Sequence, residues 1–384
     1  MSLLEYLYPI FKKVYPILYS TIYPICTLLS ICIICLFISP CNRILYTIFI
    51  LLVLSITMCI VNIQYTYYKN RINNNIYIFS SQDKFPSFFV NHKKIQYSDD
   101  TKLIDYHIAS AYKPYLTGGD EYDTISIQNI KNALLQGARF HYIEIDTSNP
   151  NNVLDDSVEL IITIPNMIQK SISLEKVFQL YKSLAWVGIN YPLILFFDCK
   201  KSVTNNKFMY KKLANLIKKY FENHFIYDNN KECKKCDTIT MKEALNNIII
   251  GTNISFSKQN KKNSTFSYFT EKLQKVCNFT IETEKKKNYS GFDIYNSGKT
   301  YTEYKIYNEK HMNILVPSVK KTSFYNIINP CYNIKQISLE KDKKTGPIKR
   351  YFTCICIYYH YNGKNKERQE YIDFFKNCSF VKKK

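Results

Sequence analysis

Two carboxylates at the end of an apolar stretch are the residues best placed to do chemistry. Glu144 and Asp146 close the segment ARFHYIEID at 138–146. Side chains alternate faces along a strand, so both carboxylates point the same way, in line with Tyr142 and Phe140. Repulsion between two like charges raises a pKa and destabilises the fold unless a cation or a cluster of donors lies between them. The pair therefore predicts either a lysine partner or a site for a hard metal ion.

A third carboxylate, Asp198, stands at the end of the apolar segment PLILFFDC at 192–199, which reads as a buried strand. Between the two segments lies a helical pattern through 174–184, and another helix is expected at 126–136. Strands that alternate with helices predict a parallel α/β sheet or barrel. Carboxylates at the C-terminal ends of such strands are typical of a barrel's active face.

The alternating pattern continues beyond these elements. We expect a polar spacer from 255 to 299, because the chain there is rich in polar residues. The remaining expected strands are 104–111, 160–164, 247–250, 313–316, 336–339 and 351–359, and the remaining expected helices are 207–221 and a short one beginning near Thr240.

Two apolar runs near the N-terminus have the length of membrane spans. Residues 14–38 and 44–63 contain no charged side chain, and the five residues between them are enough for a tight hairpin. Lysine and arginine lie on the outer flanks of the hairpin, which predicts two spans with both termini cytoplasmic. The alternative is a cleaved signal peptide, which the second apolar run disfavours.

The charge balance points to a membrane surface. The chain has 52 Lys and Arg against 31 Asp and Glu, a formal net charge of +21, although part of this excess reflects a composition biased toward lysine. The basic residues form no zinc-finger, helix-turn-helix or RNP-type pattern. We therefore expect the lipid bilayer, with its anionic phospholipid headgroups, as the partner and no nucleic acid.

Cysteine and asparagine patterns add little. Cys233 and Cys236 form the only CxxC outside the apolar N-terminal region, so reduced thiols are favoured over a zinc site. Five Asn-x-Ser/Thr triplets, including those at Asn253 and Asn278, are read as chance products of an asparagine-rich chain.

Several of these segments resemble the catalytic X and Y boxes of phosphoinositide-specific phospholipase C. SAYKPYL at 110–116 is similar to the end of that family's first strand, EID at 144–146 to its Glu-Leu-Asp, and YPLILFFD at 191–198 to a later strand. NEKHMNILVP at 308–317 and NCSFVK at 377–382 resemble the second box more loosely.

This resemblance implies a fold and an organisation. The fold would be α/β, a distorted (β/α)8 TIM-type barrel preceded by the N-terminal transmembrane helical hairpin. The expected division is 1–63 for the membrane hairpin, 64–100 for a tether, 101–254 for the X-box-like half barrel, 255–299 for the polar spacer and 300–384 for the Y-box-like half barrel.

The resemblance also implies hydrolysis of phosphoinositides with two histidines and a calcium ion, yet this chain departs from that pattern. Tyr112 and Asn166 stand near the two expected histidine positions, so no catalytic residue is assigned. A tyrosine, with an ordinary pKa near 10, exchanges protons slowly at neutral pH.

The implied metal site is altered as well. Glu144 and Asp146 remain, Asp198 replaces a glutamate, and Lys113 occupies a ligand position. The ammonium of Lys113 is a plausible substitute for calcium or a phosphate contact, which makes a calcium cofactor doubtful. If Lys113 turns outward, the three carboxylates remain able to hold a hard cation weakly. Lys320, Lys321 and Ser323 are candidates for contact with a headgroup.

Three hypotheses follow. The leading one is a membrane-anchored phospholipase C-like protein without the ordinary hydrolytic chemistry, which binds anionic lipid headgroups or a partner at the bilayer. The alternatives are an active phosphoric diester hydrolase with a rearranged site and a structural membrane protein.

Overall fold

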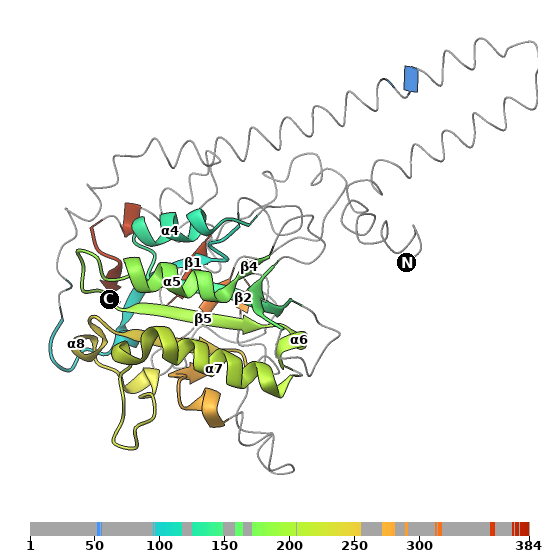
Figure 1. Cartoon of the computed structure of the whole chain (residues 1–384). Coiled ribbons are helices and arrows are strands. Elements are labelled where there is room, and N and C mark those ends of the chain that lie inside the picture. The colour runs from blue at the N-terminus through green and yellow to red at the C-terminus, as the bar shows by residue number, and fades with distance from the viewer. Residues whose placement is uncertain are drawn as a thin grey trace, which may run out of the picture. The chain divides into compact units, whose positions relative to one another are not determined.

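The computed structural model describes residues that lie mainly between positions 95 and 383 (Figure 1). The described residues are 52–53, 55, 95, 97–116, 125–148, 158–163, 171–204, 206–254, 271–280, 289–290, 312, 314–316, 354–357, 371, 373–375 and 377–383. The chain divides into two compact units, Met1–Ile78 with Ile164–Gln169, and Phe79–Thr163 with Lys170–Lys384. Almost all described residues belong to the second unit, which is described below.

The predicted membrane hairpin lies outside the described residues, apart from three positions between 52 and 55. Among the residues that the structure describes, no helix is both long and apolar enough to cross a bilayer. The expected strand at 336–339 also lies outside them.

A parallel sheet forms the framework of the second unit. Its strand order is β7-β6-β5-β2-β1-β10-β9-β8, and each pairing along this order is parallel. Neighbours follow the chain from β1 to β7 and from β8 to β10, and β10 returns to β1. This order resembles that of a (β/α) barrel, with β7 and β8 as the two ends of the described sheet. The strands are β1 (Tyr106–Tyr112), β2 (Phe140–Thr147), β5 (Leu193–Cys199), β6 (Ile248–Thr252), β7 (Phe279–Thr280), β8 (Tyr289–Ser290), β9 (Ile314–Val316) and β10 (Cys354–Ile357).

Three helices cover the outside of β1, β2 and β5, and α4, α5 and α7 lie side by side in Figure 1. In α4 (Ile127–Leu135), the Ser126 hydroxyl accepts the Gln128 N–H at the start, and Gly137 with φ 90° follows the end. The helix α5 (Leu174–Leu184) buries Leu174, Val177, Phe178 and Tyr181, whose spacing puts them on one face. The helix α7 (Lys207–Phe221) is capped by Asn206, whose side chain accepts the Phe208 N–H. These helices match the predicted ranges closely.

Two expectations are corrected. The segment expected as a strand at 160–164 forms β3 (Leu160–Ile162), but it pairs antiparallel with β2 and with β4 (Ile172–Ser173), off the parallel order. The segment 255–299, expected to be only a polar spacer, contributes β7 and β8 at the two ends of that order. Each of these strands has two residues, too few for period-two alternation to be visible in the sequence.

The first strand is completed by the C-terminal region. β11 (Phe380–Lys382) pairs antiparallel with β1. The Tyr371 hydroxyl accepts the backbone N–H of Ser110 at 2.8 Å, and Ala109 donates its N–H to the Ser379 carbonyl at 2.9 Å. Residues about 260 positions apart therefore share the backbone bonds of β1.

Short elements fill the remaining connections. They are the 3-10 turns η2 (Leu103–Asp105), η3 (Glu222–His224) and η4 (Cys236–Thr238), and the helices α6 (Lys201–Thr204) and α8 (Met241–Ala244). Thr240 and Glu243 form the capping box predicted at the start of α8.

Asn278 joins β6 to the loop that contains the CxxC. Its Oδ1 accepts the Ile250 N–H at 2.8 Å, and its Nδ2 donates to the Lys234 carbonyl at 2.8 Å. The residue is 1% exposed. An amide nitrogen held in this way is not accessible for glycosylation in the folded protein.

Replacement of Asn278 by alanine should therefore destabilise the fold. It leaves a buried N–H and a buried carbonyl without a partner, which costs about 2–4 kcal/mol in total. Chemical denaturation of the full chain in detergent, followed by circular dichroism, measures this loss. The exposed Asn230 provides a control, since Asn230→Ala should change stability by less than about 0.5 kcal/mol. Equal effects of the two substitutions would contradict the bridging role of Asn278.

Candidate functional site

The end of β1 places a lysine in an unusual backbone conformation. Lys113 has φ 41°, in the left-handed region that a lysine rarely adopts. Its N–H donates to the Tyr142 carbonyl at 2.9 Å, and its carbonyl accepts the Leu116 N–H at 3.0 Å. The turn is thus held by hydrogen bonds on both sides, at a strain of about 1–2 kcal/mol.

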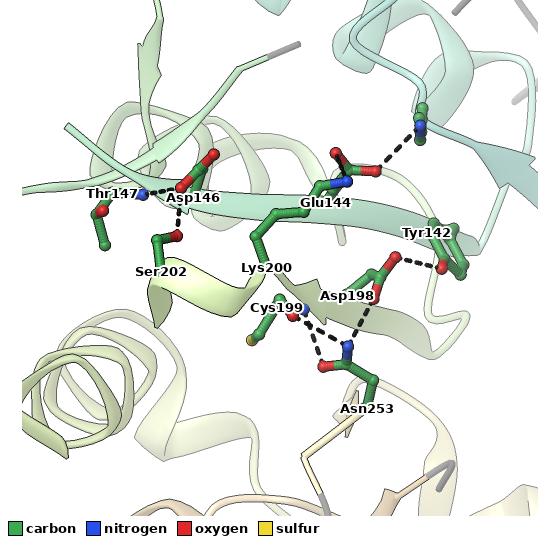
Figure 2. Close-up of polar contacts among 10 residues, drawn as sticks. Tyr142, Glu144, Asp146, Thr147, Asp198, Cys199, Lys200, Ser202 and Asn253 are labelled. Atoms are coloured by element: carbon green, nitrogen blue, oxygen red, sulfur yellow. Dashed lines mark hydrogen bonds and ion pairs between the residues drawn. The ribbon is translucent and has the colours of Figure 1, made fainter. Parts of the chain in front are cut away.

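The Glu144 carboxylate lies between two lysines (Figure 2). The Lys113 ammonium is 3.1 Å from Oε2, and the Lys200 ammonium is 2.6 Å from Oε1. The side chain of Glu144 is 7% exposed, that of Lys113 is 13% exposed and that of Lys200 is 39% exposed. Each oxygen of this nearly buried carboxylate therefore has its own cationic partner.

Asp198 is held by neutral donors on the neighbouring strand ends. Tyr142 donates its hydroxyl to Oδ2 at 2.7 Å, and Asn253 donates Nδ2 to Oδ1 at 2.6 Å (Figure 2). Burial raises the pKa of Asp198, the Tyr142 hydrogen bond opposes the rise, and the charge of Glu144 adds to it. Burial and the Asp198 carboxylate raise the pKa of Tyr142 well above its ordinary value, so this hydroxyl remains a donor.

Asp146 engages different partners, further along β2. Its Oδ1 accepts the Ser202 hydroxyl from α6 and the Thr147 N–H, the latter at 2.8 Å. Glu144 and Asp146 were predicted to share a lysine partner or a metal ion. They have different partners instead: Glu144 contacts two lysines and Asp146 contacts a serine.

Tyr112, at the expected position of the first histidine, packs in an aromatic cluster. Its ring is 5.0 Å from that of Tyr142, and the Lys113 ammonium is 5.2 Å from the Tyr112 ring. The other predicted site residues, Asn166, Lys320, Lys321 and Ser323, lie outside the described residues.

Sequence reasoning missed three residues of this network: Lys200, Ser202 and Asn253. Lys200 directly follows β5, and Asn253 directly follows β6. The rule that ligands gather beyond the C-terminal ends of parallel strands would have found both, because β5 and β6 are neighbours. Ser202 lies in α6, a helix of four residues that gave no periodic signal.

The histidines near these strands face away from the site. His141 Nδ1 lies 2.7 Å from the Tyr181 hydroxyl of α5, on the helix side of β2, because alternation along the strand puts His141 and Glu144 on opposite faces. The ring of His107 packs edge-on against Phe374 at 6.0 Å. Neither histidine is among the partners of Glu144 or Asp198.

The buried thiols show no sign of ligand chemistry. Burial raises the pKa of Cys233 to about 12 and that of Cys236 well above its ordinary value, so both remain protonated. In the described part of the chain, no three His, Cys, Asp or Glu side chains are grouped so as to hold a metal ion.

Comparison with known proteins identifies the half of the barrel that carries this site. Residues 100–254 match the model of the family described as phosphatidylinositol-specific phospholipase C, X domain. Residues 100–254 are thus similar to a phospholipase C X domain, in a divergent form. No curated protein sequence matches this phospholipase C-like chain.

Two crystal structures share its fold. The PLC21 proteins of L. pealei and S. officinalis are each 14% identical to it, with TM-scores of 0.53 and 0.51. Each comparison covers 75% of this chain and 38% of the other chain. The phospholipase C-like chain thus corresponds to less than half of either protein, and at this identity the likeness shows the fold alone.

The calcium ion that the family resemblance implies does not fit the residues as they are arranged. Both oxygens of Glu144 contact ammonium groups, and both oxygens of Asp198 accept hydrogen bonds. A calcium ion requires six to eight oxygen ligands free to coordinate it. We therefore derive no step through calcium.

His141 allows a test of the helix-side assignment. Burial lowers its pKa from 6.5 to about 3, so the folded chain leaves the imidazole neutral where the unfolded chain protonates it. Its contribution to stability is complete above about pH 6.5 and is lost as pH falls toward 3, at about 1.4 kcal/mol per pH unit. The substitution His141→Phe should remove this part of the slope in denaturation of the full chain from pH 7 to pH 4. Tyr181→Phe is the control, because it removes the hydrogen bond but keeps the imidazole. Parallel pH profiles for His141→Phe and the unmodified chain would contradict the assignment.

Proposed function

We propose that this chain is a phospholipase C-like barrel that binds an anionic phosphoinositide headgroup at a bilayer without hydrolysing it. The observation that carries the proposal is the contact between the Lys113 ammonium and Glu144. A lysine closes on the carboxylate that would otherwise coordinate a metal, in a barrel of the phospholipase C type.

The proton chemistry supports the same conclusion. Transfer of a proton by a positioned side chain contributes about 10²- to 10⁴-fold to a rate, and it requires a group that titrates near the working pH. The strand end that would carry the first histidine has Tyr112, beside Tyr142, whose pKa is raised well above its ordinary value. These hydroxyls serve as packing and hydrogen-bonding groups, so the described part of the chain provides no acid or base for the ordinary mechanism.

The charge of the site bears on what it can attract. Two ammonium groups lie near the carboxylates of Glu144 and Asp198, so their charges largely balance. Long-range attraction for an anionic headgroup then comes from the rest of the chain, with its formal charge of +21. At short range, the partly exposed Lys200 is the ammonium that can reach a phosphate.

Attachment to the membrane is part of the proposal. It rests on the two apolar runs at 14–38 and 44–63 and on the lysine and arginine residues that flank them, which favour two spans with both termini cytoplasmic. A soluble domain tethered in this way remains within reach of headgroups on the cytoplasmic leaflet, where anionic lipids are abundant.

Hydrolysis is tested with the full chain reconstituted into nanodiscs that contain phosphatidylinositol 4,5-bisphosphate. With calcium present, we expect no release of inositol trisphosphate above that of empty nanodiscs, because no acid–base pair is in place. A release that Asp146→Asn abolishes would establish an active hydrolase instead.

Binding is tested separately, by titration of soluble inositol trisphosphate into the full chain in phosphatidylcholine nanodiscs. Loss of one charge-assisted contact costs about 1.5 kcal/mol, so Lys200→Ala should weaken binding about tenfold. The exposed Lys201 of α6 is the control, and Lys201→Gln should change affinity by less than about threefold. Binding that is absent, or unaffected by Lys200→Ala, would favour a purely structural membrane protein.

A further inference from the structure

The two strand-end carboxylates Glu144 and Asp198 need a compensating charge. They are register partners on the adjacent parallel strands β2 and β5. Neighbouring strands lie about 4.8 Å apart, and side chains of register partners lie on the same face of the sheet. Two carboxylates in this arrangement repel each other strongly when water is largely excluded.

The chain supplies the compensation from two different elements. Lys113 comes from the turn after β1, and Lys200 comes from the position after β5. Figure 2 shows Lys200 extending from the end of β5 to the Glu144 carboxylate on β2. Each oxygen of Glu144 therefore has an ammonium group of its own.

The two oxygens of Asp198 also have partners within the chain. Tyr142 and Asn253 donate to its two oxygens, and Asn253 is in turn fixed by the Cys199 N–H, which donates to its Oδ1 at 2.9 Å. Each oxygen of Glu144 and of Asp198 thus has a partner within the chain.

We propose that Lys113 and Lys200 together take the place of a divalent cation at this site. The two ammonium groups carry the charge of one such ion and contact the two oxygens of one carboxylate, so the site is complete without metal. A phosphate bound here is bound independently of calcium; this last point alone rests on the proposed function.

The two lysines contribute differently. Lys113 is 13% exposed and its backbone is hydrogen-bonded on both sides, so it stays with Glu144. Lys200 is 39% exposed, so its ammonium reaches both Glu144 and solvent. Lys113 is the fixed half of the pair, and Lys200 is the half that turns toward an incoming anion.

The backbone at Lys113 makes a clean substitution available. Asparagine adopts the left-handed region more readily than lysine, so Lys113→Asn keeps the turn, removes the ammonium and adds an oxygen ligand. Lys200→Gln removes the second ammonium at a partly exposed position. Lys201→Gln is the matched control, since Lys201 is exposed and adjacent.

The test measures metal binding by the full chain in detergent, with no lipid headgroup present. Terbium luminescence excited through nearby tyrosines such as Tyr112 and Tyr142 reports occupancy, and calcium competes with terbium. The unmodified chain, Lys201→Gln and Lys200→Gln should give no site-specific signal. The double variant Lys113→Asn with Lys200→Gln should bind terbium, with competition half-complete at about 10⁻⁴–10⁻³ M calcium. A further Glu144→Gln should abolish the signal.

Two outcomes overturn the proposal. One is a Glu144-dependent terbium signal from the unmodified chain, which would show that the lysines do not displace a metal. The other is a double variant with the unmodified far-ultraviolet circular dichroism spectrum that binds no terbium. If the double variant does not fold, the single variant Lys113→Asn decides. The proposal then requires that Lys113→Asn binds terbium with a dissociation constant above about 10⁻³ M. It also requires that the unmodified chain binds none. Because no headgroup is used, these results are independent of whether the proposed lipid binding holds.

Discussion

The nearly buried Glu144 carboxylate is the charge around which the site is arranged. An ionised group shielded from water is tolerated only when partners compensate it, and removal of one partner from such a group is expensive. The lysine after β1 and the lysine after β5 meet that requirement from opposite sides of β2. Two features hold this arrangement in place. The left-handed turn positions Lys113, and the hydrogen bonds from Tyr142 and Asn253 hold Asp198.

The sheet explains why residues so distant in sequence meet. In a parallel sheet all C-terminal strand ends lie at one edge, and the order β6-β5-β2-β1 brings together the positions after four consecutive strands of that edge. Lys113, Lys200 and Asn253 each directly follow a strand, and Glu144 lies within the last four residues of β2. The fold would provide the same meeting point to a hydrolase, and only the identities of the side chains distinguish the two uses.

Much of this framework was visible in the sequence, because it depends on local periodicity. The ranges of α4, α5, α7, β2 and β5 followed from the spacing of apolar residues. The pairing of Lys113 with Glu144 followed from the family resemblance. The antiparallel pairing of β3, the strands of two residues in the supposed spacer and the role of Lys200 did not follow. Pairing partners and contacts of long side chains depend on tertiary arrangement, and in a lysine-rich chain one more lysine carries no signal.

The way β1 is completed has a consequence for the order of events during synthesis. This strand emerges from the ribosome early, but its backbone bonds to Tyr371, Ser379 and β11 require residues made some 260 positions later. Domains otherwise tend to fold as their N-terminal parts appear. Here an apolar strand with unsatisfied edges must wait until nearly the whole chain has been translated.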